Sequence, residues 1–162
     1  MNTHLEDYIK KLLLSLEITK ASQLNEDISI KLGIPVYTWD EPSRCSFHKG
    51  KYSIFLNNRL SKVDRWKQFC HELGHALWHY GDKNVMPFPY IQMQEWQANN
   101  FMLHLAIPSF MLEKLKLPTT RSQSILMISE VFNVDFALAE KRLDMYFRKK
   151  HESLYFQKIK MR

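Results

Sequence analysis

The chain has 162 residues, of which 45% are hydrophobic and 25% charged, and it carries a formal net charge of +6. This length predicts one ordinary domain with at most a small helical appendage, and the composition is typical of a globular protein. The apolar runs are too short to span a bilayer, and the sequence has neither a glycine-rich phosphate loop nor a Gly-x-Ser-x-Gly element, so it gives no support to a membrane, nucleotide-dependent or serine-hydrolase function.

The N-terminal region is expected to be helical. Leucine, isoleucine and tyrosine residues at helical spacing predict an amphipathic helix over 3–17. A second short helix is predicted over 22–32, where Gly33 ends the apolar pattern. Neither helix contains a group with obvious chemistry, so both are expected to cover a sheet.

Three strands are expected next. The β-branched and aromatic residues of 34–39 predict the first strand. The segments 45–48 and 51–56 flank Lys49-Gly50, which predicts a hairpin turn between them.

The two cysteines do not predict a disulfide framework. No basic segment followed by an apolar stretch and a cleavage site opens the chain, so we expect a cytoplasmic protein. In that compartment Cys45 and Cys70 are expected to stay reduced, with Cys70 facing the core.

The sequence His71-Glu72-Leu73-Gly74-His75 places two histidines four residues apart, with a glutamate beside the first. In a helix, such residues lie one turn apart on the same face. Both imidazoles can therefore bind one metal ion, and Glu72 can reach a water on that metal. Two histidines, a later carboxylate and one open position form the ligand set of a catalytic zinc.

A helix around this motif is predicted over 61–80. Ser61 followed by Asp64 forms a variant of the capping box, and apolar residues then recur every three or four positions. Gly81 is expected to end the helix. Gly74 lies inside it at a cost of about 1 kcal/mol relative to alanine, which indicates a close neighbour at that point.

The third ligand is expected downstream. Glu95 is the only acid between Asp82 and Glu113, and it opens a second helical pattern over 95–105. The stretch 81–94 contains two prolines and predicts a loop that joins the two helices and rims a cleft.

Three residues of the second helix bear on the site. Asn99 is one turn from Glu95, so its amide oxygen can orient a metal-bound imidazole. Ala98 is small and is expected to let this helix approach Gly74. His104 is expected on the opposite side, as a packed or surface histidine rather than a catalytic one.

The pattern His71-Glu72-x-x-His75, then Glu95-x-x-Ala98-Asn99-x-Phe101 and Ala106-Ile107-Pro108, resembles the ImmA/IrrE metallo-endopeptidases. The resemblance covers roughly residues 50–145. The chain departs from the family pattern in the segment before the first histidine and at His104.

The resemblance implies an α+β fold with a zincin-like core, in which a small twisted sheet is packed by helices. It implies one Zn²⁺ ion bound by His71, His75 and Glu95, with Glu72 as general base. Manganese and iron stay open as alternatives. For an oxyanion donor, His79 is the nearest candidate, although a packed or supporting role is the alternative; Tyr80 and Tyr90 are further candidates.

The substrate class also follows from the resemblance. Family members of phages and mobile elements cut the element's own helix-turn-helix repressor, which predicts a site-specific endopeptidase here. A regulator that binds a repressor or DNA without cutting is one rival, although a pure binder would not need Glu72. A housekeeping peptidase is the other rival.

By analogy with zincins, an edge strand is expected to pair with an extended substrate. The strand over 52–56 is the candidate, and an ordinary hairpin is the alternative.

The C-terminal region predicts two further helices, over 122–132 and 135–147, joined by Asn133-Val134 in a helix-turn-helix-like arrangement. Residues 116–162 carry ten Lys and Arg against five Asp and Glu. Because the second helix is interrupted by acids, specific DNA binding is not expected, and the basic excess is interpreted as a solvated surface. The predicted divisions are a peptidase core over 1–116, a helical segment over 117–150 and a basic tail over 151–162.

Overall fold

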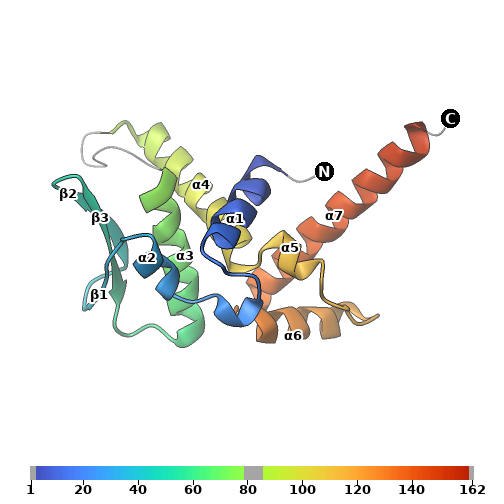
Figure 1. Ribbon diagram of the computed structural model, residues 1–162, viewed down its shortest axis with the longest axis horizontal. Helices are drawn as coiled ribbons and strands as arrows, with labels where there is room; N and C mark the ends of the chain where they lie inside the picture. The colour runs from blue at the N-terminus through green and yellow to red at the C-terminus, as the bar shows by residue number, and fades with distance from the viewer. Residues whose placement is uncertain (1–2, 79–85, 161–162) are drawn as a thin grey trace.

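A small sheet and a set of helices share one buried cluster of hydrophobic side chains (Figure 1). The computed structural model describes residues 3–78 and 86–160, and side chains as far as residue 152. The N-terminal elements are α1 (His4–Ser15), the 3₁₀ turn η1 (Ala21–Gln23), α2 (Asp27–Lys31), β1 (Val36–Trp39), β2 (Arg44–His48) and β3 (Lys51–Asn57). They are followed by α3 (Lys62–Trp78), α4 (Phe88–Ala106), α5 (Ser109–Leu112), α6 (Arg121–Phe132) and α7 (Phe136–Lys160).

The sheet has the strand order β1-β3-β2. The predicted hairpin is present, with β2 antiparallel to β3, while β1 runs parallel to β3 on its other side. The central strand is therefore β3, and the expectation that 52–56 forms an edge was wrong. Periodicity shows which faces of a strand are buried, but it does not show on which side of a hairpin a third strand pairs.

Two of the predicted helices begin with a side-chain cap, of which only the one at Ser61 was predicted from the sequence. Thr3 and Glu6 form a reciprocal capping box at α1. The Ser61 hydroxyl accepts a hydrogen bond from the Asp64 backbone N–H at 3.1 Å and donates to its carboxylate at 2.7 Å. These bonds satisfy backbone donors that the first turn of a helix leaves unpaired.

The helix predicted over 22–32 is broken into η1 and α2. Between them Asn25 accepts a hydrogen bond from the backbone N–H of Asp27 at 2.8 Å, which is a local turn that competes with helix formation. Gly33 follows α2 with a φ of +70°, so it ends the helix as expected.

Helix α4 begins at Phe88, so the second part of the predicted loop over 81–94 is helical; residues 81–85 lie outside the described part of the chain. Pro87 is the N-cap residue and Pro89 lies in the first turn. The first turn of a helix needs no backbone donor, so proline is tolerated there. The prolines that indicated a loop instead mark a helix start.

The close neighbour predicted at Gly74 is present, and the nearest atoms belong to Phe101. A β-carbon at Gly74 would lie 3.0 Å from a ring carbon of Phe101 and 3.1 Å from its β-carbon. Any larger residue would push α3 and α4 apart at the level of the motif. Phe101 is fully buried, so it has no open space into which to move.

The C-terminal helices form the predicted pair. Asn133 adopts the left-handed conformation at the end of α6, with a φ of 52°, and the Asp135 carboxylate accepts a hydrogen bond from the Leu138 N–H at 2.7 Å at the start of α7. Helix α7 continues to Lys160, beyond the predicted end at Phe147. Its buried residues belong to the same cluster as those of α1, α3 and α4. The predicted boundary after residue 116 stays a prediction.

None of the described helices is both long enough and apolar enough to cross a membrane.

Candidate metal centre

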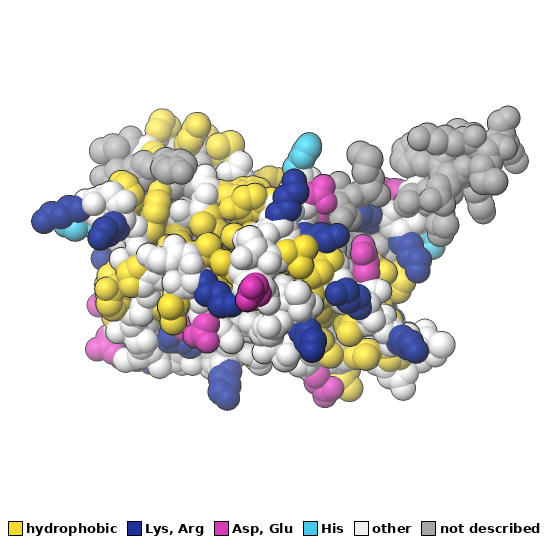
Figure 2. Space-filling view, in the orientation of Figure 1, with side chains coloured by type: hydrophobic (Ala, Val, Ile, Leu, Met, Phe, Trp, Pro, Cys, Tyr) yellow, Lys and Arg dark blue, Asp and Glu magenta, His cyan; other side chains and the backbone are white. Residues whose placement is uncertain are grey.

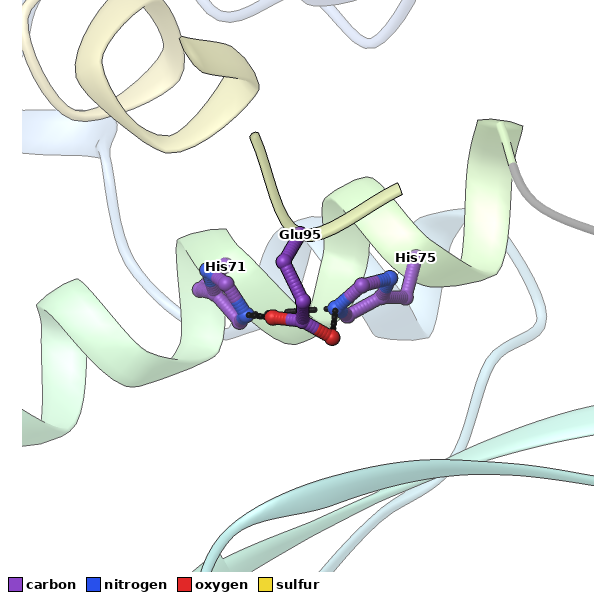
Figure 3. A group of neighbouring side chains, drawn as sticks. All are labelled: His71, His75 and Glu95. Carbon is purple, nitrogen blue, oxygen red and sulfur yellow. Dashed lines mark hydrogen bonds and ion pairs between the residues drawn. The ribbon is translucent and has the colours of Figure 1, made fainter. Parts of the chain in front are cut away.

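The side chains of His71, His75 and Glu95 meet between α3 and α4 (Figure 3). One ligand atom from each residue lies within 4.8 Å of the other two. The two histidines project from successive turns of α3, and the glutamate projects toward them from α4. The close packing of the helices at Gly74 and Phe101 sets this approach.

The ligand atoms are close to one another. His71 Nε2 and His75 Nε2 are 3.1 Å apart. Glu95 Oε2 lies 3.2 Å from His71 Nε2, and Glu95 Oε1 lies 3.3 Å from His75 Nε2. His75 is only 4% exposed, so its imidazole is held away from bulk water.

The contact with Asn99 determines which ring nitrogen of His71 carries the proton. Its Oδ1 lies 3.1 Å from His71 Nδ1. Because an amide oxygen is only an acceptor, Nδ1 carries the proton and Nε2 of the neutral ring presents a lone pair. That lone pair faces His75 Nε2 and the Glu95 carboxylate, and such a convergence of electron-rich atoms is favourable around a cation.

The spacing of the two imidazole nitrogens is close to that of neighbouring ligands in a tetrahedral metal site. Bonds of about 2.0 to 2.1 Å from a zinc ion to nitrogen or oxygen place neighbouring ligand atoms about 3.3 Å apart in a tetrahedron. The two imidazole nitrogens are 3.1 Å apart, and each lies 3.2 to 3.3 Å from a different oxygen of the Glu95 carboxylate. Three protein ligands leave a fourth position for water or substrate, which is the arrangement of catalytic rather than structural zinc sites.

The other predicted site residues are placed as follows. Glu72 is buried on α3, at 6% exposure, directly after the first histidine. His79 and Tyr80 lie outside the described residues. Tyr90 is 55% exposed at the start of α4. The oxyanion donor is therefore not assigned among these three.

His104 and Cys70 are packed residues. His104 is 5% exposed, and burial, followed by the positive charge of Arg142, lowers its pKa to about 4. It is therefore neutral near pH 7 and belongs to the core, as expected. Cys70 is fully buried and neither cysteine forms a disulfide; burial, followed by the charge of Glu26, raises the pKa of the Cys70 thiol well above its usual value.

Two features near the site were missed from the sequence. The first is Phe101 against Gly74, which the phenylalanine of the second motif could have indicated. The second is the approach of α7 to the side of α3, where the ammonium group of Lys67 lies 2.6 Å from the carboxylate of Asp135. Lys67 is one turn before His71, so this ion pair brings α7 next to the metal cluster.

Replacing Asn99 with alanine is expected to weaken zinc binding about 10- to 100-fold, because His71 loses the acceptor that fixes its ring and tautomer. Competition with a zinc chelator measures this affinity. Gln92→Ala, an exposed amide on the same helix, is the matched control and should leave the affinity unchanged. Equal affinities for Asn99→Ala and the original protein would contradict the assigned role.

Comparison with known proteins agrees with this geometry. Residues 26–144, which include all three clustered residues, match the IrrE N-terminal-like domain of the Peptidase_M78 family. The chain is 41% identical over 157 residues to the phage-like element PBSX protein XkdA of Bacillus subtilis (strain 168), covering 96% of this chain and 79% of that protein. It is 36% identical over 159 residues to the protein YqaB of the same organism, covering 98% of this chain and 92% of that protein.

The family match spans well over half of the chain, and both relatives are aligned over nearly its full length. The resemblance to the ImmA/IrrE proteins is thereby confirmed, and the chain belongs to the IrrE N-terminal-like, Peptidase_M78 family of metallopeptidases.

Proposed function

We propose that this protein is a zinc-dependent, site-specific endopeptidase that cleaves a helix-turn-helix repressor and thereby relieves repression of a phage or mobile element. The observation that carries the proposal is the cluster of His71, His75 and Glu95, with Glu72 next to the first ligand on the same helix. A protein that only bound a metal would need the ligands but not this buried carboxylate.

Each residue has a distinct chemical task. A zinc ion held by the three ligands would supply Lewis-acid polarisation of the scissile carbonyl and acidify a water molecule. Glu72 takes a proton from the attacking water and delivers it to the leaving amine. Asn99 keeps His71 Nδ1 protonated and its Nε2 directed at the cluster.

A protein substrate fits the surface around the site. The first half of α4 exposes a band of large hydrophobic side chains on either side of Glu95, visible at the upper left of Figure 2. These residues are Phe88 at 69% exposure, Tyr90 at 55%, Met93 at 43% and Trp96 at 67%. Exposed apolar patches of this kind are typical of surfaces that bind other proteins.

The sheet offers one open edge near α3. Because β3 is central, β2 replaces 52–56 as the strand that could pair with an extended segment of substrate. Helix α3 packs against both β2 and β3, so this edge lies on the same side of the molecule as the motif helix.

One relative is named as a phage-like element protein of Bacillus subtilis, which supports a mobile-element setting. The proposal therefore places the reaction in the cytoplasm, where a repressor would be bound to DNA.

The proposed function does not include sequence-specific DNA binding by the C-terminal helices. Arg121 of α6 forms ion pairs with Asp144 and Glu140 of α7 rather than presenting its charge to a phosphate. On the face shown in Figure 2, Lys and Arg side chains are interspersed with acidic ones and do not gather in one patch. Phosphate binding needs concentrated positive charge.

The proposal is tested by co-expression with the helix-turn-helix repressor encoded beside the gene, followed by mass spectrometry of the repressor. One discrete pair of fragments is expected. An intact repressor held in a stable complex would instead establish the non-cleaving regulator, and degradation of casein at a similar rate would establish a housekeeping peptidase.

A further inference from the structure

A cavity of about 350 Å³ adjoins the metal cluster on the side of α7. We name it the α3–α4–α7 pocket after the helices that form it. Its lining consists of Lys67, Gln68, His71, Asn99, Met102, Asp135, Ala137, Leu138 and Lys141. Since His71 is both a cluster residue and part of this lining, a side chain bound in the pocket would lie next to the scissile bond.

The pocket has an apolar part and a polar part. Met102 and Leu138 supply apolar surface from α4 and α7. Lys67 and Lys141 contribute two positive charges to the lining, whereas Asp135 contributes one negative charge. A volume of about 350 Å³ is at the lower end of the range for ligand sites, which suits one side chain with its adjoining backbone.

The one carboxylate among the described lining residues is already engaged. Asp135 Oδ2 accepts a hydrogen bond from Lys67 at 2.6 Å, and Oδ1 accepts one from the Leu138 backbone N–H at 2.7 Å. Partial burial raises the pKa of Asp135, but these bonds outweigh burial and the net pKa is lowered. Asp135 therefore stays ionised and has little capacity left for a cationic ligand.

The remaining polar groups are mainly donors. Lys141 is exposed and pairs with no carboxylate in the part of the chain that the structure describes. Asn99 uses its oxygen on His71, which leaves its NH₂ group available. A ligand that brings acceptor oxygens and negative charge is complementary to this arrangement, whereas a lysine or arginine side chain would be repelled.

We propose that the α3–α4–α7 pocket binds an acidic side chain of the substrate, preferably glutamate, beside the scissile bond, and that Lys141 is the residue that selects it. The methylene groups of glutamate would contact Met102 and Leu138 while its carboxylate meets Lys141. This inference rests on the proposed function, because it assigns a specificity subsite of the same reaction.

The first experiment profiles cleavage. A library of peptides of diverse sequence is digested with the zinc-loaded protein, and the residues flanking each cut are identified by mass spectrometry. Glutamate is expected to be enriched at one position next to the cut. Lys141→Glu should shift that preference toward lysine and arginine by up to about fivefold, the upper end of what one accessible ion pair contributes. Lys150→Glu, an equal charge change further along α7 on another face, should leave the preference unaltered.

The second experiment detects binding without cleavage. The Glu72→Gln protein is labelled at its methionine methyl groups and titrated with the amidated peptide Ac-Ala-Ala-Glu-Ala-Ala-NH₂, while NMR follows Met102. The methyl resonance should shift, and it should not shift with the lysine counterpart or in the Glu72→Gln, Lys141→Glu double variant. A peptide of alanines with a free C-terminus tests whether a terminal carboxylate occupies the pocket instead.

The outcomes separate the two proposals. Cleavage with no change of preference in Lys141→Glu overturns the subsite and leaves the endopeptidase function standing. If the original protein cuts neither the repressor nor the library, the proposed function fails, and the Met102 titration alone decides the pocket. Shifts that are absent, equal for glutamate and lysine, or produced only by the free C-terminus overturn the assignment to an acidic side chain.

Discussion

If the proposed cleavage of a repressor takes place, replacing Glu72 with glutamine is expected to lower its rate about 100- to 10,000-fold without reducing the amount of metal that the protein binds. Glutamine keeps the size of the side chain but is not a base, so it removes the proton transfer and leaves the three ligands intact. Metal analysis of the purified variant, together with the cleavage rate at saturating zinc, measures both parts of this expectation.

Glu95→Ala is the companion variant. It removes a ligand, so the protein should lose most of its metal along with its activity. The contrast between the two variants separates a base from a ligand. If Glu72→Gln is also free of metal, Glu72 is not the base that we assign.

Replacing Glu6 with glutamine is expected to destabilise the fold by about 3 to 5 kcal/mol. This is the cost of removing one partner of a buried ion pair, which leaves the charge of the other partner uncompensated. Glu6 is 5% exposed and Arg142 is 2% exposed, and their charged groups lie 3.6 Å apart. Ser109 donates a hydrogen bond to the same carboxylate, and Lys149 donates another at 2.6 Å. Chemical denaturation at pH 7 measures the loss.

A control and a pH series follow from the same network. Lys149→Met removes a partner that is 27% exposed and should cost much less than the loss of Glu6. Burial alone raises the pKa of Glu6, but the bonds from Lys149, Ser109 and Thr3 outweigh burial and lower the pKa to about 2. The stability that the ionised form contributes is therefore complete above about pH 4.5 and is lost as the pH falls toward 2. If Glu6→Gln matches the original protein at pH 7, the network does not stabilise the fold.

The meeting of His71, His75 and Glu95 was predictable because it depends largely on local spacing. His71 and His75 lie on one helical face whatever surrounds them, and the position of Glu95 followed from the scarcity of other acids in that region. Asn99 followed by the same helical geometry, since it is one turn from Glu95. Short-range periodicity thus predicted which side chains could meet before any tertiary contact was known.

The misassigned features depend on contacts between distant segments. The spacing of apolar residues in 52–56 does not show that β1 pairs with β3 and thereby makes β3 the central strand. The ion pair between Lys67 and Asp135 joins residues far apart in the chain, and either residue alone is typical of an exposed helical surface. Pro87 and Pro89 are compatible with a loop and with the first turn of a helix, so the prolines alone do not decide between the two.

Part of the pocket is formed by α7, so the residues that would set substrate preference and those that would carry out catalysis lie partly on different helices. Ala137 and Lys141 line the α3–α4–α7 pocket from a helix that carries none of the three clustered ligands. Under the proposed function, mutations at these positions would change the preferred substrate while the clustered residues on α3 and α4 stay unchanged. The proposed protease and its target would then be able to change together through a few surface positions of one helix, without passing through an inactive ancestor.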